Sequence, residues 1–204
     1  MTHAVARAVR GHLWILLLVA AGPAQAQGVQ VAPFAGYQFG GSVRGVASGQ
    51  QHSFESGLTW GGTASFALAD RWRVELLYSR HESGLSPAAT PGSTLDLTTE
   101  RLMVGIQEEK GAGRTRYFGS FLLGATRFTP GLSGVGSETR FAASLGLGLK
   151  RFVSDNFGLR LEARAFYTLV QSGGGVFCSG GCLFVFSGSG IWQGDLTAGL
   201  VLAF

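Results

Sequence analysis

The feature that most constrains this chain is a strict alternation of residue types in its C-terminal half. Between Phe141 and Leu149 every second residue is apolar, and the residues between them are Ala, Ser or Gly. Residues 157–169 and 195–204 repeat the pattern. Because side chains of a strand point alternately to two faces, these segments are predicted as β-strands with one apolar face each. No helix-period pattern of useful length occurs in residues 27–204.

Composition indicates where the apolar faces point. Only 14% of the 204 residues are charged, 46% are hydrophobic and 33 are Gly, whereas a soluble domain has about 25% charged residues. Outside the first 26 residues there is no apolar run of the roughly 18 residues that a membrane helix needs. Apolar faces opposite Gly-rich faces with charges of both signs predict a transmembrane β-barrel with lipid outside and a polar interior.

The number of strands follows from the alternating segments and the connections between them. Eight segments are predicted as strands: Val29–Phe39, Phe54–Leu68, Arg71–Arg80, Leu95–Gln107, Arg116–Phe128, Glu138–Val153, Phe157–Val170 and Trp192–Phe204. Short and long connections largely alternate between them, which is typical of outer-membrane barrels with short periplasmic turns and longer extracellular loops. We therefore predict an all-β, eight-stranded antiparallel up-and-down barrel in a Gram-negative outer membrane, with both termini in the periplasm.

The first 26 residues have the layout of a secretory signal peptide. Arg7 and Arg10 precede a short apolar core, and Ala24-Gln25-Ala26 matches a cleavage site. The core is too short for a membrane anchor. The predicted domains are therefore a signal peptide over 1–26 and an outer-membrane β-barrel over 27–204. Cleavage would leave 14 basic and 12 acidic residues, and with no basic run nucleic acid is not an expected partner.

Three segments then carry a family resemblance. They are DLTAGLVLAF at the C-terminus, PFAGYQFGGS near the start, and RFVSDNFGLRLEARAF. The chain resembles the small eight-stranded outer-membrane β-barrels of the OmpA transmembrane-domain and OmpX type. The resemblance implies that Phe204 is the signal read by the barrel-assembly machinery, with periplasmic chaperones as further partners during biogenesis. Outer-membrane lipid and lipopolysaccharide would surround the barrel. No OmpA-like peptidoglycan-binding domain is recognised behind it.

Strand parity predicts a charged interior. The side chains predicted to face inward are Arg73, Glu75, Lys150, Arg160, Glu162, Arg164 and Asp195. The turn at 154–156 sets Lys150 opposite Arg160, and like charges there need an intervening carboxylate. Glu162 and Glu75 are the candidates. Gly146 and Gly148 would leave room for larger inward side chains.

Two functional interpretations of these charges stay open. The first is a salt-bridged structural core, because an eight-stranded barrel holds little besides its own side chains. The second is a gate, in which an Arg or Lys exchanges carboxylate partners and opens a narrow path. Acid–base catalysis by the carboxylates is disfavoured, since a substrate could hardly enter. No catalytic, cofactor-binding or metal-binding residue is predicted.

The only cysteines, Cys178 and Cys182, are spaced CSGGC. An exported chain meets an oxidising compartment, so we predict a small disulfide loop, with two reduced thiols as the alternative. A metal site lacks nearby His, Asp or Glu to complete its shell. This connection also holds several Phe and Val residues. Strands seven and eight could extend as a pinned hairpin that binds an extracellular ligand, or these side chains could pack on neighbouring loops.

One further pattern concerns His81 and Ser83. An H-x-S pair on a strand shares one face, and a lipid A deacylase uses a His/Ser pair on the barrel surface. In that family Asn follows the pair, whereas Gly84 follows it here, so we interpret both residues as solvated loop residues.

The aromatic residues are predicted to form two interfacial girdles. Amphipathic rings prefer the membrane interface. Trp72, Phe157 and Phe204 are expected at the periplasmic ends of the strands; Tyr78, Tyr167 and Trp192 are expected at the outer ends. Sugar stacking by Trp192 is the alternative to anchoring.

The sequence thus predicts a non-enzymatic barrel with a structural or surface-loop role in adhesion or protection. A narrow gated channel is the first alternative, and a lipid A-modifying enzyme is the second.

Overall fold

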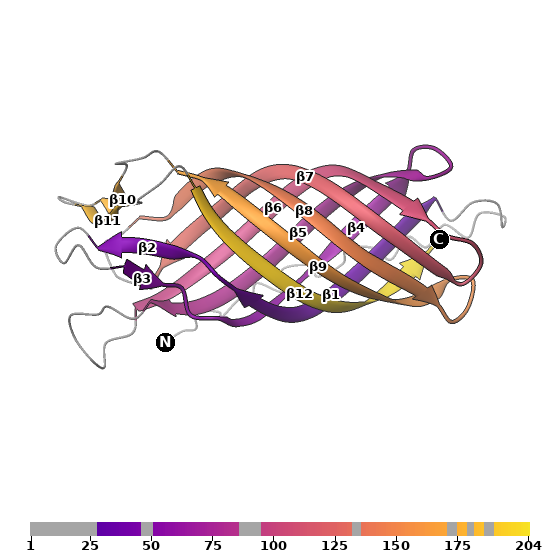
Figure 1. Cartoon of the computed structure of the whole chain (residues 1–204), viewed down its shortest axis with the longest axis horizontal. Helices are drawn as coiled ribbons and strands as arrows, with labels where there is room; N and C mark the ends of the chain where they lie inside the picture. The colour runs from indigo at the N-terminus through magenta and orange to yellow at the C-terminus, as the bar shows by residue number, and fades with distance from the viewer. Residues whose placement is uncertain are drawn as a thin grey trace, which may run out of the picture.

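A computed structural model describes residues 28–45, 51–85, 95–131, 136–170, 175–178, 182–185 and 190–204; within these, side chains are described except for 42–45, 51–53, 84–85, 95, 175–178 and 182–185. Eight strands form a closed barrel in which every neighbouring pair is antiparallel (Figure 1). They are β1 (Val29–Phe39), β4 (Gly57–Ala67), β5 (Trp72–Leu85), β6 (Leu95–Lys110), β7 (Thr115–Pro130), β8 (Glu138–Phe152), β9 (Phe157–Leu169) and β12 (Gly190–Ala203). The predicted eight-stranded all-β barrel is confirmed.

The barrel closes where the first strand meets the last. Residues of β1 pair with β12 on one side and with β4 on the other. Val29 and Phe204 exchange two backbone hydrogen bonds, of 3.3 and 2.9 Å. The C-terminal residue is therefore tied into the sheet, and no barrel strand keeps an open edge along this seam.

Alternation of exposure along the strands matches the predicted faces. In β9 every second residue is buried over nearly the whole strand. The outward residues are large and apolar, with Leu147 of β8 exposed by 71% and Leu161 of β9 by 51%. An apolar exterior around a polar interior is the arrangement that lipid requires. Among the described residues, no helix is long and apolar enough to cross a membrane.

The two ends of the barrel differ. The connections between β4 and β5, β6 and β7, and β8 and β9 are short, and they lie at the same end as the C-terminus (Figure 1). We call this the short-turn end and the other the long-connection end. The β6–β7 turn uses Gly111 and Gly113 at φ +132° and +71°, in the region that favours glycine. At the β8–β9 turn, Asn156 donates to the Ala203 carbonyl at 2.7 Å.

Three predicted strand boundaries are wrong by three residues or more. The fourth strand was expected to end at Gln107, but β6 continues to Lys110. The third strand was expected to end at Arg80, but β5 continues to Leu85 because those residues pair with β6 along their whole length. The second was expected to begin at Phe54, but β4 begins at Gly57. The Phe54 ring instead stacks on Phe128 of β7, with ring centroids 6.3 Å apart.

The long-connection end carries a second sheet that the alternation did not predict. Its order is β10 (Gly175–Cys178), β11 (Cys182–Val185), β2 (Ser42–Gly45) and β3 (Gln51–Ser53). The first and last long connections are therefore joined by backbone pairing between β2 and β11. A hairpin does form in this connection, as β10–β11, with the Cys178 backbone opposite Cys182. It belongs to the second sheet and not to an extension of the barrel strands β9 and β12. Because the side chains of 171–189 lie outside the described residues, the disulfide and the packing of the loop aromatics remain predictions.

Candidate functional site in the charged lumen

Two carboxylates and two guanidinium groups meet in the middle of the barrel. Glu75 of β5 accepts hydrogen bonds from Arg160 at 2.9 Å and Arg164 at 2.8 Å, both on β9. Glu162 accepts from the same two arginines, with Arg160 Nη2 at 2.9 Å. All four side chains are buried. The charges balance, so each buried ion has opposite charge and hydrogen bonds around it, as burial demands.

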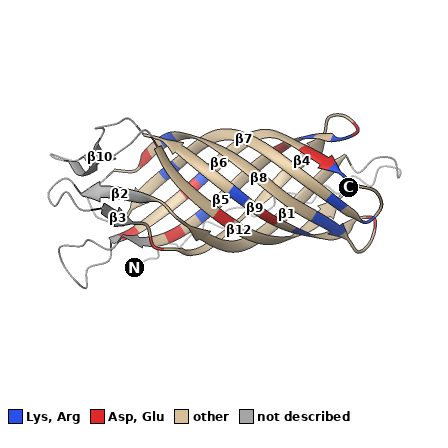
Figure 2. Cartoon of the chain, in the orientation of Figure 1, with Lys and Arg blue, Asp and Glu red and all other residues tan. Residues whose placement is uncertain are grey.

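The cluster is also tied to the other walls of the barrel. Arg160 Nη1 donates to Thr63 of β4 at 3.1 Å, and Arg164 Nη1 donates to Ser144 of β8 at 3.1 Å. We call Glu75, Arg160, Glu162 and Arg164 the central cluster. Figure 2 shows charges of both signs along the barrel strands, separated by uncharged stretches.

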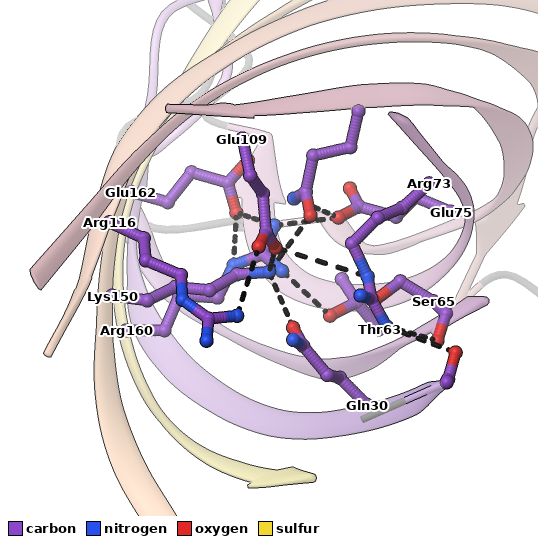
Figure 3. Close-up of polar contacts among 12 residues, drawn as sticks. Gln30, Thr63, Ser65, Arg73, Glu75, Glu109, Arg116, Lys150, Arg160 and Glu162 are labelled. Atoms are coloured by element: carbon purple, nitrogen blue, oxygen red, sulfur yellow. Dashed lines mark hydrogen bonds and ion pairs between the residues drawn. The ribbon is translucent and has the colours of Figure 1, made fainter. Parts of the chain in front are cut away.

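A second charged group lies beside the central cluster (Figure 3). It is nearer the short-turn end, because Lys150 and Glu109 lie close to the ends of β8 and β6 that lead into the short turns. Lys150 of β8 forms an ion pair with Glu109 of β6. Its Nζ also donates to Gln30 at 2.7 Å and to Gln107 at 2.8 Å. Arg73 and Arg116 lie 3.9 and 3.6 Å from the Glu109 carboxylate. We call Arg73, Glu109, Arg116 and Lys150 the lower cluster.

Gln107 joins the two clusters. Its side-chain oxygen accepts from Lys150, and its Nε2 donates to Glu75 at 2.7 Å. The Phe118 ring packs beside the charges, with Arg160 4.3 Å and Lys150 5.2 Å from its centroid. The part of the lumen toward the short-turn end is therefore a connected set of contacts that is packed like a protein core.

The predicted lumen residues differ in whether they form the expected contacts. Lys150 does lie opposite Arg160 in the β8–β9 register, but its charge is met by Glu109, a residue that the sequence analysis missed. The predicted fourth strand ends at Gln107, two residues before Glu109. Asp195, although predicted as part of the network, forms no ion pair within 4 Å among the described residues.

An apolar layer separates the central cluster from the part of the lumen nearer the long-connection end. It consists of Leu77, Met103, Leu122, Ala142 and Phe166, with Phe34 packed against them. Beyond it lies Arg101 of β6, which is completely buried. Its Nη1 and Nη2 donate to Gln38 and Gln193, each at 2.7 Å, and its guanidinium lies 4.2 Å from the Phe166 ring centroid. Arg101 lies within the predicted strand Leu95–Gln107 but was not among the residues predicted to face inward.

His81 and Ser83 lie in a barrel strand and not in a loop. His81 was interpreted as a solvated loop residue, but β5 extends past it and buries its side chain. Its Nδ1 lies 2.9 Å from the Leu58 carbonyl. Ser83 shares its face by parity, so both lie on the lumen side. A lipid-facing catalytic pair is therefore wrong for these two residues.

The aromatic residues predicted for the outer girdle lie at different heights. Tyr78 lies mid-strand rather than at an outer end, because β5 is longer than predicted. Tyr167 and Trp192 pack together near the long-connection end, with ring centroids 4.8 Å apart. No group of three or more His, Cys, Asp or Glu side chains that could hold a metal ion is found in the part of the chain with described placement.

The family described as outer membrane protein beta-barrel domain matches residues 14–204. The chain belongs to this outer-membrane β-barrel family. Its place is accordingly the bacterial outer membrane, where the apolar exterior contacts lipid. No curated protein matches it.

Solved structures of this barrel type share the fold at low identity. Neisserial surface protein A is 14% identical with a TM-score of 0.58, and the match covers 88% of this chain and 98% of that one. OprG from Pseudomonas aeruginosa is also 14% identical with a TM-score of 0.58, covering 87% and 99%. AlkL, solved in lipid bilayers, is 14% identical with a TM-score of 0.53, covering 90% and 95%.

Proposed function

We propose that this protein is a non-enzymatic outer-membrane barrel that presents its long connections for adhesion or surface protection, while its lumen charges serve as a structural core. The observation that carries this proposal is the sheet joining β2 and β11 at the long-connection end. In the proposed orientation, with both termini in the periplasm, this sheet faces the cell exterior.

The joined connections suit recognition for an entropic reason. The β2–β3 and β10–β11 hairpins are held to one another by backbone pairing. A segment that is ordered before binding loses less conformational freedom when a partner docks. The lumen supports the same proposal, because the charges of the central cluster are buried and paired with one another.

Replacing residues 42–53 and 174–186 by short Gly-Ser turns tests the presentation role. We expect bacteria expressing this variant to attach to an epithelial cell layer no better than bacteria lacking the protein. The matched control replaces residues 111–114 at the short-turn end and should attach like wild type. Heat-modifiable migration on gels checks that both variants fold. Full attachment by a folded loop variant would contradict the proposal.

A narrow gated channel is a second candidate, favoured by one observation. A 570 Å³ cavity at the short-turn end is lined in part by Arg73, Glu109 and Arg116, where the connected charges begin. Single-channel recording of the refolded protein in a planar bilayer, with Glu162→Ala in parallel, separates the two functions. A structural core predicts silence from both proteins. Discrete openings altered by the substitution would favour the channel.

A further inference from the structure

Two cavities lie next to one another at the short-turn end of the lumen. The first is the 570 Å³ cavity described above, and the second has a volume of 470 Å³. Residues from the β4–β5 turn and the β6–β7 turn line both, and the residues that the two linings share are Asp70, Arg71, Glu109 and Arg116. We call the combined space the mouth cavity. Its volume is in the range of sites that bind small molecules.

Strand parity directs charged side chains from the barrel wall into the mouth cavity. Arg73 of β5, Glu109 of β6 and Arg116 of β7 occupy inward positions on neighbouring strands (Figure 3). Arg71 joins them from the β4–β5 turn. Gly113 lines the opposite turn, where an added Cβ would meet nothing within 4 Å. The cavity is therefore charged on its inner wall and open at its rim.

Positive charge exceeds negative charge around the mouth cavity. The cationic side chains of the first lining are Arg71, Arg73 and Arg116, and its carboxylates are Asp70 and Glu109. Lys150 pairs with Glu109 from deeper in the lumen, so four cations meet two carboxylates. The remaining charges nearby do not offset this excess, because Lys110 at the rim is paired with Glu108 at 3.2 Å and the central cluster is neutral in itself.

One carboxylate is shared among three of these cations. Glu109 accepts a hydrogen bond from Lys150. Arg73 and Arg116 lie 3.9 and 3.6 Å from the same carboxylate, which is beyond hydrogen-bonding distance. Arg71 forms no ion pair within 4 Å with any residue that the structure describes. An anion in the cavity would therefore supply negative charge that the carboxylates of the lining supply only in part.

Two of the guanidinium groups are held in place by the barrel itself. Arg73 Nη2 donates to the carbonyls of Gly28 and Ser65 at 3.1 and 3.3 Å, and its Nε donates to Ser65 Oγ at 3.1 Å. The Arg116 guanidinium lies 4.8 Å from the ring centroid of Phe152. Side chains that are already fixed lose little conformational freedom when a ligand binds. Their partial burial also strengthens their attraction for an anion.

We propose that the mouth cavity binds a small soluble phosphate monoester. Such a group carries a charge of about −1.5 to −2 at pH 7, which matches the excess of positive charge. Its oxygens can accept from several guanidinium groups at once, whereas a monocarboxylate would balance only half of the excess. The cavity lies inside the ring of strands, so its ligand arrives from water and not from lipid. In the proposed orientation that water is the periplasm.

This site is independent of the presentation role, because it lies at the opposite end of the barrel. It also differs from the channel alternative, since binding at the mouth does not require passage through the central cluster. A barrel that is silent in a planar bilayer can still hold a phosphate monoester here.

Isothermal titration calorimetry with glycerol phosphate tests the site. The refolded barrel in phosphatidylcholine nanodiscs should show saturable binding in a phosphate-free buffer. The double variant Arg71→Gln/Arg116→Gln removes two positive charges from the lining and should weaken binding by about tenfold or more. The matched control is Arg114→Gln/Arg151→Gln, which removes two exposed arginines at the same end but outside the cavity. It should bind like wild type, and heat-modifiable migration checks that both variants fold.

Two further arms identify the ligand chemistry and its source. Acetate should bind about tenfold more weakly than glycerol phosphate, because it is a monoanion. Glycerol phosphate should bind equally well in nanodiscs that contain phosphatidylglycerol; loss of binding there would show that lipid phosphates fill the site and would overturn the soluble ligand. Equal binding of acetate would overturn the phosphate assignment. No saturable binding by wild type, or equal effects of the two double variants, overturns the site itself.

Discussion

Glu75→Gln is expected to lower the free energy of unfolding by about 3–5 kcal/mol, the usual cost of removing one partner from a buried ion pair. Glu75 is completely buried and accepts from Arg160, Arg164 and Gln107. Glutamine keeps the shape but removes the charge, so two buried guanidinium groups would share Glu162 alone. Urea titration of the refolded protein, followed by tryptophan fluorescence, measures the change.

An exposed ion pair on the same strand supplies the control. Glu82 lies 2.9 Å from Arg80, and its side chain is 66% exposed. Glu82→Gln should change the free energy of unfolding by less than about 1 kcal/mol, because solvent already screens this pair. Adding Arg164→Met to Glu75→Gln should recover part of the lost stability by removing the uncompensated charge. Equal effects of Glu75→Gln and Glu82→Gln would show that the central cluster does not stabilise the barrel.

Gly146→Val is also expected to destabilise the barrel, because Gly146 packs directly against the central cluster. A Cβ at this inward position would collide with Glu162 Oε1 and approach Ser120 Oγ to 2.6 Å and Arg164 Cζ to 3.2 Å. The prediction that this glycine leaves room for larger inward side chains is thereby confirmed. Overpacking alone costs about 1–3 kcal/mol, and displacing a buried carboxylate from its arginines adds to it. We expect a loss above 3 kcal/mol in the same urea titration.

Gly119 on β7 is the matched outward glycine. A Cβ there would lie 3.5 Å from Leu147 Cδ2, an ordinary contact. Gly119→Val should therefore be neutral within about 0.5 kcal/mol. If Gly146→Val is also neutral, the side chains of the central cluster can move aside at little cost, and the lumen is looser than its contacts indicate.

Much of the fold could be predicted because the strands of a β-barrel show a local pattern, the alternation of apolar and polar residues. The period of two decides which residues of one strand face lipid, and that pattern needs no knowledge of the neighbouring strands. Parity alone therefore placed Arg160, Glu162 and Arg164 in the lumen. Length and turn residues were enough to count eight strands, although β5 ran past its predicted end because pairing with β6 continues to Leu85.

What only the tertiary structure decided is which interior side chains meet. Glu75 and Arg160 are 85 residues apart, and their contact depends on the register of every strand pair between them. The same register brings Glu109 to Lys150 and turns His81 inward, and it gives Asp195 no ion pair with any other described residue. Pairing of β2 with β11 likewise joins segments from opposite ends of the chain. One strand's alternation specifies a face, whereas closure of the whole barrel sets the distances across its lumen.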